Sequence, residues 1–76
     1  MSTALKRYVE DFRAAAEQSP QDGADMFMKL VKTAKAEEVS ERTTAQRVAD
    51  VIRFLGDVTE EQKTAIGIAR VRLHFQ

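Results

Sequence analysis

Apolar residues recur along the chain at the three- and four-residue spacing of amphipathic helices. A first helix is predicted from Ser2 to about Gln18, and its apolar face comprises Leu5, Tyr8, Val9, Phe12 and Ala16. The opposite side, which we expect to face solvent, carries Lys6, Glu10, Arg13 and Glu17. A second helix is predicted from Pro20 to about Glu38, with an apolar face of Phe27, Leu30, Val31 and Ala34.

The boundary between these helices has a clear chemical signal. Ser19 is a favourable N-cap residue, because its hydroxyl can accept a hydrogen bond from a free amide of the first turn. Pro20 suits the first helical position and disfavours helical geometry at the residue before it. One helix therefore ends near Gln18 and the next begins at Pro20.

Two capping boxes predict the starts of the remaining helices. Thr43 and Gln46 have the Thr-x-x-Gln spacing, so a third helix begins at Ser40 or Thr43 and continues through Val48, Val51, Ile52 and Leu55. Gly56 follows as a natural C-terminal stop. Thr59 and Gln62 repeat the spacing and start a fourth helix.

Residues 66–75 fit two conformations. As a helix, the fourth segment has one stripe of Gln62, Ala65, Ile66, Ala69 and Leu73, and Ile68, Val71 and Phe75 extend the apolar surface toward a second side. As a strand, Arg70 to Phe75 alternates between polar and apolar residues at a period of two, but such a strand has no partner within this chain. We favour the helix because the capping box fixes its start, although Gly67 costs it about 1 kcal/mol relative to alanine.

The predicted fold class is all-α, a small compact bundle of about four short helices in a single domain over residues 1–76. The size and composition agree with a single domain, since 76 residues with 43% hydrophobic and 32% charged content can form one core. The predicted core consists of Leu5, Tyr8, Val9, Phe12, Phe27, Leu30, Val31, Val48, Val51, Ile52, Leu55, Ile66, Ala69 and Leu73.

The composition limits the kinds of functional site that the chain can form. There is no cysteine and His74 is the one histidine, so we expect no disulfide, no zinc site, and no metal or other cofactor. The acidic residues lie at positions that the periodicity places in solvent, and the serines precede predicted helices, where capping explains them. We therefore expect no enzymatic activity. The charged N-terminal segment and the short apolar runs predict a cytoplasmic protein without a membrane span.

A DNA-binding function is the alternative hypothesis. Residues 39–48 resemble the turn and the recognition-helix start of a helix-turn-helix module. The resemblance implies that Thr43, Thr44, Gln46 and Arg47 approach base edges and phosphates. With the preceding helix, where Ala34 fits the small-residue position, the resemblance covers about twenty residues, and it departs from the pattern at the turn, where Glu38 occupies the usual glycine position. Glu37, Glu38 and Glu41 would oppose a phosphate surface, and the formal net charge of zero does not favour one either.

The main hypothesis is protein binding, since the C-terminal part carries more apolar residues than one helix face can bury. The alternative explanation is that the fourth helix is the central, most buried element of the bundle. Phe54, Ile68, Val71 and Phe75 are the predicted contact residues, edged by Arg70 and Arg72. On a helix, Lys63, Gly67, Arg70 and His74 form a basic line that can meet an acidic patch on another protein or a nucleic-acid backbone. We expect a small regulator or inhibitor that docks on a larger bacterial or phage machine, such as RNA polymerase or a CRISPR complex, or a self-associating protein.

Overall fold

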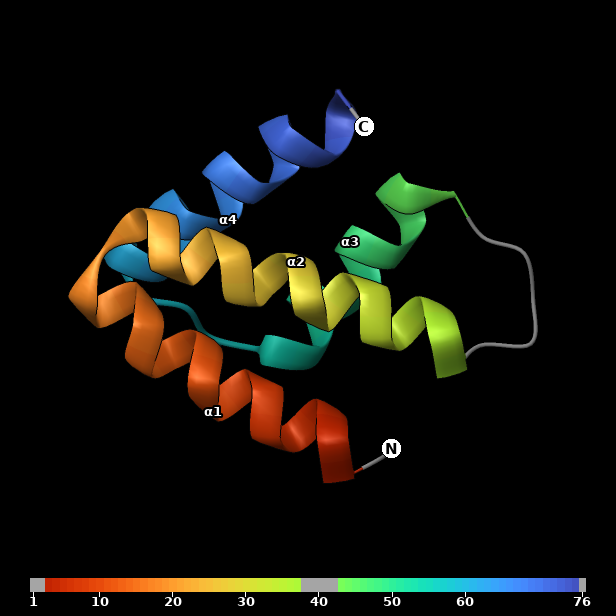
Figure 1. The fold of residues 1–76 in the computed structure, drawn as a ribbon, viewed down its shortest axis with the longest axis horizontal. Coiled ribbons are helices and arrows are strands. Elements are labelled where there is room, and N and C mark those ends of the chain that lie inside the picture. Colours follow the sequence, from red (N-terminus) through yellow and green to blue (C-terminus); the bar gives the residue numbers. More distant parts are fainter. Residues whose placement is uncertain (1–2, 38–42, 76) are drawn as a thin grey trace.

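The chain folds into helices joined by short connections (Figure 1). The computed structural model describes residues 3–37 and 43–75. Within them lie α1 (Thr3–Gln18), α2 (Pro20–Glu37), α3 (Thr44–Leu55) and α4 (Glu60–His74). The predicted all-α bundle is confirmed. The strand alternative for residues 66–75 is wrong, because α4 continues through His74.

The predicted helix ends form as the sequence indicates. The Asp22 amide donates to the Ser19 hydroxyl over 3.0 Å, so Ser19 caps α2. Both capping boxes are complete, with reciprocal bonds between Thr43 and Gln46 and between Thr59 and Gln62. Gly56 ends α3 with a φ of 73°, in the region that only glycine adopts without strain.

α2 is the central helix of the fold. It packs extensively against α1 and α4, and it also supports α3 (Figure 1). α3 and α4, by contrast, barely touch each other. The excess of apolar residues in α4 therefore does not reflect a central position for that helix.

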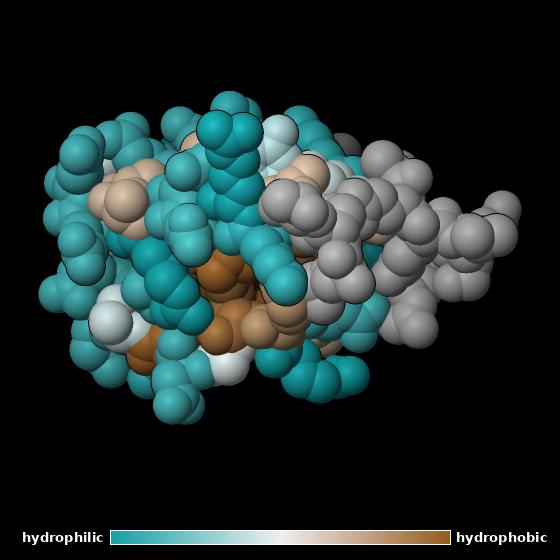
Figure 2. Space-filling model, turned by 90° about the horizontal axis from the view of Figure 1, so that it is seen from below, coloured by the Kyte–Doolittle hydropathy of each residue, from teal (hydrophilic) through white to brown (hydrophobic). Residues whose placement is uncertain are grey.

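The core forms where α1, α3 and α4 meet α2. Phe12 and Phe27 are fully buried, and their ring centroids lie 5.8 Å apart in a tilted arrangement. Most of the predicted core is buried, whereas Tyr8, Val9, Ile52 and Leu73 are only partly buried against it. On the face shown in Figure 2, hydrophilic residues surround a band of exposed hydrophobic ones. This is expected of a domain too small to cover its core completely.

Arg13 was expected on the solvent side, and that expectation is wrong. The guanidinium is partly buried and donates to the Leu55 carbonyl at 2.8 Å, the Gln62 Oε1 at 2.9 Å and the Asp57 carbonyl at 3.3 Å. One side chain of α1 thus connects the end of α3 to the start of α4. A cation at this point also complements the negative end of the α3 dipole.

The closest approach between helices occurs at Gly23. A Cβ placed there would lie 2.7 Å from the Ala65 Cβ and 2.9 Å from the Cα and Cβ of Ala16. Gly23 therefore allows α1, α2 and α4 to meet at one point. Within α2 this glycine has a steric function that outweighs its low helix propensity.

Alanine substitutions at the two helical glycines should have opposite effects on the stability of the fold. Gly23→Ala should lower the free energy of unfolding by about 1 to 3 kcal/mol, because the new methyl group overlaps Ala16 and Ala65. Gly67→Ala should raise it by about 0.5 to 1 kcal/mol, because its Cβ meets nothing within 4 Å and alanine favours the helix. Denaturant unfolding followed by circular dichroism measures both, and equal stability of the two variants would contradict the close packing at Gly23.

Arg13→Met should lower the free energy of unfolding by about 1 to 3 kcal/mol, because the partly buried Leu55 carbonyl loses its donor and Gln62 Oε1 loses one of its two. Arg7→Met is the matched control, since Arg7 is an exposed arginine on the same helix. That variant should stay within about 0.5 kcal/mol of the parent. Equal effects of the two substitutions in urea unfolding would show that Arg13 does not join the helices.

Candidate functional site

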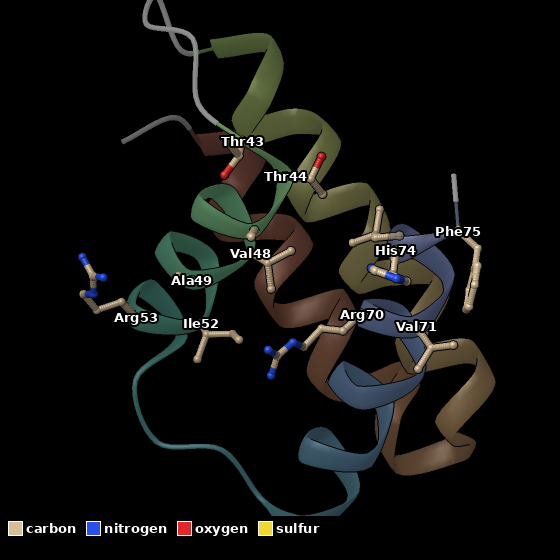
Figure 3. A pocket seen from close by; sticks show the side chains of 12 residues that line it. Thr43, Thr44, Val48, Ala49, Ile52, Arg53, Arg70, Val71, His74 and Phe75 are labelled. Atoms are coloured by element: carbon tan, nitrogen blue, oxygen red, sulfur yellow. The ribbon is translucent and has the colours of Figure 1, made fainter.

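A groove opens between α3 and α4, because both helices rest on α2 while making little contact with each other. Its volume is about 1000 Å³ (Figure 3). One wall comes from the outward side of α3 and the other from the last turns of α4. The groove is the principal candidate site among the described residues.

The α3 wall is mainly apolar. Ala45, Val48, Ala49 and Ile52 line it, with Thr43 and Thr44 at the N-terminal end of the helix and Arg53 at the other end. Val48 is buried and Ile52 is partly buried, so these two side chains belong to the core and to the groove. The apolar stripe of α3 is wide enough to pack on α2 with one edge and to face the groove with the other.

The α4 wall has two adjacent rows of side chains. Arg70 and His74, four residues apart, point toward α3 (Figure 3). Val71 and Phe75 form the next row, on the outer side of α4. The His74 and Phe75 rings meet edge to face with centroids 5.0 Å apart. A basic row therefore lies between two apolar surfaces.

The charged side chains that line the groove are all positive. Arg53, Arg70 and His74 are its ionisable residues, and no acidic residue lines it. Asp50 lies 3.6 Å from Arg53 on the same helix and partly offsets that charge. Arg70 is exposed and makes no ion pair with any residue that the structure describes. Its guanidinium is therefore available to a ligand.

Only some of the residues predicted to bind protein line the groove. Arg70, Val71 and Phe75 line the groove, and Val71 and Phe75 are 59% and 81% exposed. Ile68 is partly buried against the core, and Arg72 pairs with Asp25 of α2 at 2.6 Å. Phe54 is 36% exposed but does not line the groove. The predicted surface thus reduces to the end of α4.

Of the four residues of the DNA-binding alternative, two line the groove and two do not. Thr43 and Thr44 are exposed and line the groove. The Gln46 side chain accepts from the Thr43 amide at 2.9 Å, within the capping box. Arg47 is only 9% exposed, so its side chain does not extend toward a ligand at the surface. The acidic residues Glu38 and Glu41 lie outside the described residues.

Sequence reasoning missed most of the α3 wall. Ala45, Ala49 and Arg53 were not singled out, and Val48 and Ile52 were assigned to the core alone. The available signal was the width of the apolar stripe, since Ala45, Ala49 and Ile52 extend the Val48 side of α3 by helical spacing. His74 was identified as part of a basic line, and the structure places it beside Arg70 in the groove.

Other kinds of site find no support in the described ranges. Residues 3–37 and 43–75 contain no cluster of three or more histidine, cysteine or acidic side chains that could hold a metal ion. None of the described helices combines the length and the apolar character required to cross a membrane. Comparison with known proteins found no matching family model, no matching curated protein and no matching solved structure.

Proposed function

We propose that this protein is a non-enzymatic interaction module that binds a partner protein in the α3–α4 groove. One observation carries the proposal. Among the described residues, the exposed large hydrophobic side chains are Phe54, Val71 and Phe75, and two of them line the same groove. Exposed apolar side chains gathered around a concavity are typical of a protein-binding surface.

Burial of these side chains supplies the energy for binding. Full burial of a large apolar side chain contributes about 1.5 to 3 kcal/mol, and Val71 and Phe75 have most of this contribution still available. Ile52 and Leu73 are partly exposed along the same groove. A partner that covers these four side chains gains binding free energy from apolar contacts on both walls of the groove.

The character of the groove favours protein over DNA. A DNA-binding surface requires several cations that reach phosphates, since electrostatics dominates the affinity. Here Arg47 is buried and Arg53 is near Asp50, so Arg70 is the one arginine of the groove lining that has no acidic side chain nearby among the described residues. We therefore place DNA binding second. In the biological role that we propose, the protein is a regulator or inhibitor that docks on a larger bacterial or phage assembly.

The double variant Val71→Ser/Phe75→Ser tests the proposal. It should abolish capture of the partner from a lysate of the source organism, because both side chains contribute to the groove. The fold should remain, since both positions are exposed and helical circular dichroism should match that of the parent. Phe54→Ser is the matched control, because Phe54 is an exposed aromatic residue outside the groove, and it should preserve capture.

Two results would contradict the proposal. Unchanged capture by the double variant would exclude the groove as the binding site, and unfolding of that variant would place Val71 and Phe75 in the core. Retention of duplex DNA that is lost in Thr44→Glu would support the helix-turn-helix alternative instead. Thr44 is suited to this test because it is exposed in the first turn of α3, where an acidic residue also favours the helix.

A further inference from the structure

From the chemistry of the groove we infer the class of its occupant: an amphipathic α-helix of a partner protein, with carboxylates beside its apolar face. The inference rests on the proposed function and adds to it the conformation and the charge of the bound segment. Three features of the groove support it: the walls, the length and the sign of the charge.

The walls favour a helix over an extended peptide. Both walls are helices whose backbone groups are hydrogen-bonded within α3 and α4, and the described residues form no sheet whose edge could accept another strand. An extended peptide in this apolar groove would bury its own amides and carbonyls without partners. A helix satisfies those groups internally and presents only side chains, the usual mode of recognition in grooves between helices.

The length of the groove sets the size of the bound segment. The α3 wall extends from Thr43 to Arg53, a rise of about 15 Å at 1.5 Å per residue. About three turns of a partner helix cover that length. Apolar residues at i, i+3 or i+4, and i+7 would then contact Val48 and Ile52 on one side and Val71 and Phe75 on the other.

The charge of the groove selects acidic partners. The Arg70 guanidinium points across the groove toward Ile52 and α3, whereas the Arg53 side chain extends from α3 away from α4 (Figure 3). A carboxylate at the end of the partner's apolar stripe, at the level of Ile52, reaches Arg70 from there. The arginine then forms a charge-assisted hydrogen bond that no described residue of this chain provides.

The same charge argues against a second copy of this chain as the occupant. In a two-fold symmetric interface, the same surface of each subunit faces the other. Two grooves that face each other in this way would bring the arginines of one lining, Arg53 and Arg70, near those of the other, with no carboxylate in either lining to compensate. An acidic helix from a different protein removes this repulsion.

Selection from a library of helices tests the inference. The full chain is used to select from phage-displayed helical miniproteins with one randomised helix face, and the binding of selected peptides is measured by fluorescence anisotropy. The selected sequences should combine the apolar spacing with flanking aspartate or glutamate. Arg70→Glu should weaken their binding about tenfold or more, because it replaces an attractive pair by a repulsive one. Exchange of the peptide carboxylates for lysines should restore binding to that variant.

Lys29→Glu is the matched control, since it reverses an exposed charge on α2 outside the groove and should change binding less than about twofold. Two outcomes would overturn this inference and leave the proposed function intact. The selected peptides could lose binding to Val71→Ser/Phe75→Ser although they carry no acidic residue, or they could bind Arg70→Glu as well as the parent. Failure to select any peptide sensitive to that double variant would overturn both. A solution dimer that the double variant dissociates would identify the occupant as a second copy.

Discussion

The packing of α4 on α2 determines the rest of this structure. The first turns of α4 are held where Ala65 approaches Gly23, close enough that no Cβ fits at that glycine. Gln62, Ala65, Ile66 and Ala69 are buried along the same side. Beyond Ala69 only Leu73 still packs against the core, and the last turns expose Val71, His74 and Phe75. The contact of α4 with the core is thus tight near its start and looser along the groove at its end.

Arg13 gives the connection between α3 and α4 a defined geometry. The carbonyls at the end of a helix have no partners within it, and an apolar environment makes their desolvation costly. Arg13 supplies donors to the Leu55 and Asp57 carbonyls and also binds Gln62, whose Oε1 accepts from the Thr59 amide in the α4 capping box. The end of one helix and the cap of the next therefore depend on a side chain from a third.

The helix boundaries were accessible from the sequence, and the groove was not. Ser19, Thr43, Gly56 and Thr59 mark boundaries through bonds that span a few residues, so local spacing was sufficient to find them. The groove depends instead on the angle at which α3 and α4 leave α2, which periodicity does not encode.

The candidate site was predicted in part for the same reason. Arg70, Val71 and Phe75 were found because apolar residues exceed one face of α4, but nothing local distinguished Phe54 or Ile68 from them. Arg13 was missed because its hydrogen-bond partners are more than forty residues away in the sequence. Arg72 likewise pairs with the distant Asp25, on a side of α4 that does not line the groove.

The attachment of α3 has a further consequence for recognition. This helix has less contact with its neighbours than the other three described helices have, although Val48, Val51 and Leu55 are buried and Arg13 bonds to its C-terminal end. Weakly packed elements are those that open at the lowest cost in free energy. The α3 wall of the groove is therefore less firmly packed against the rest of the fold than the α4 wall.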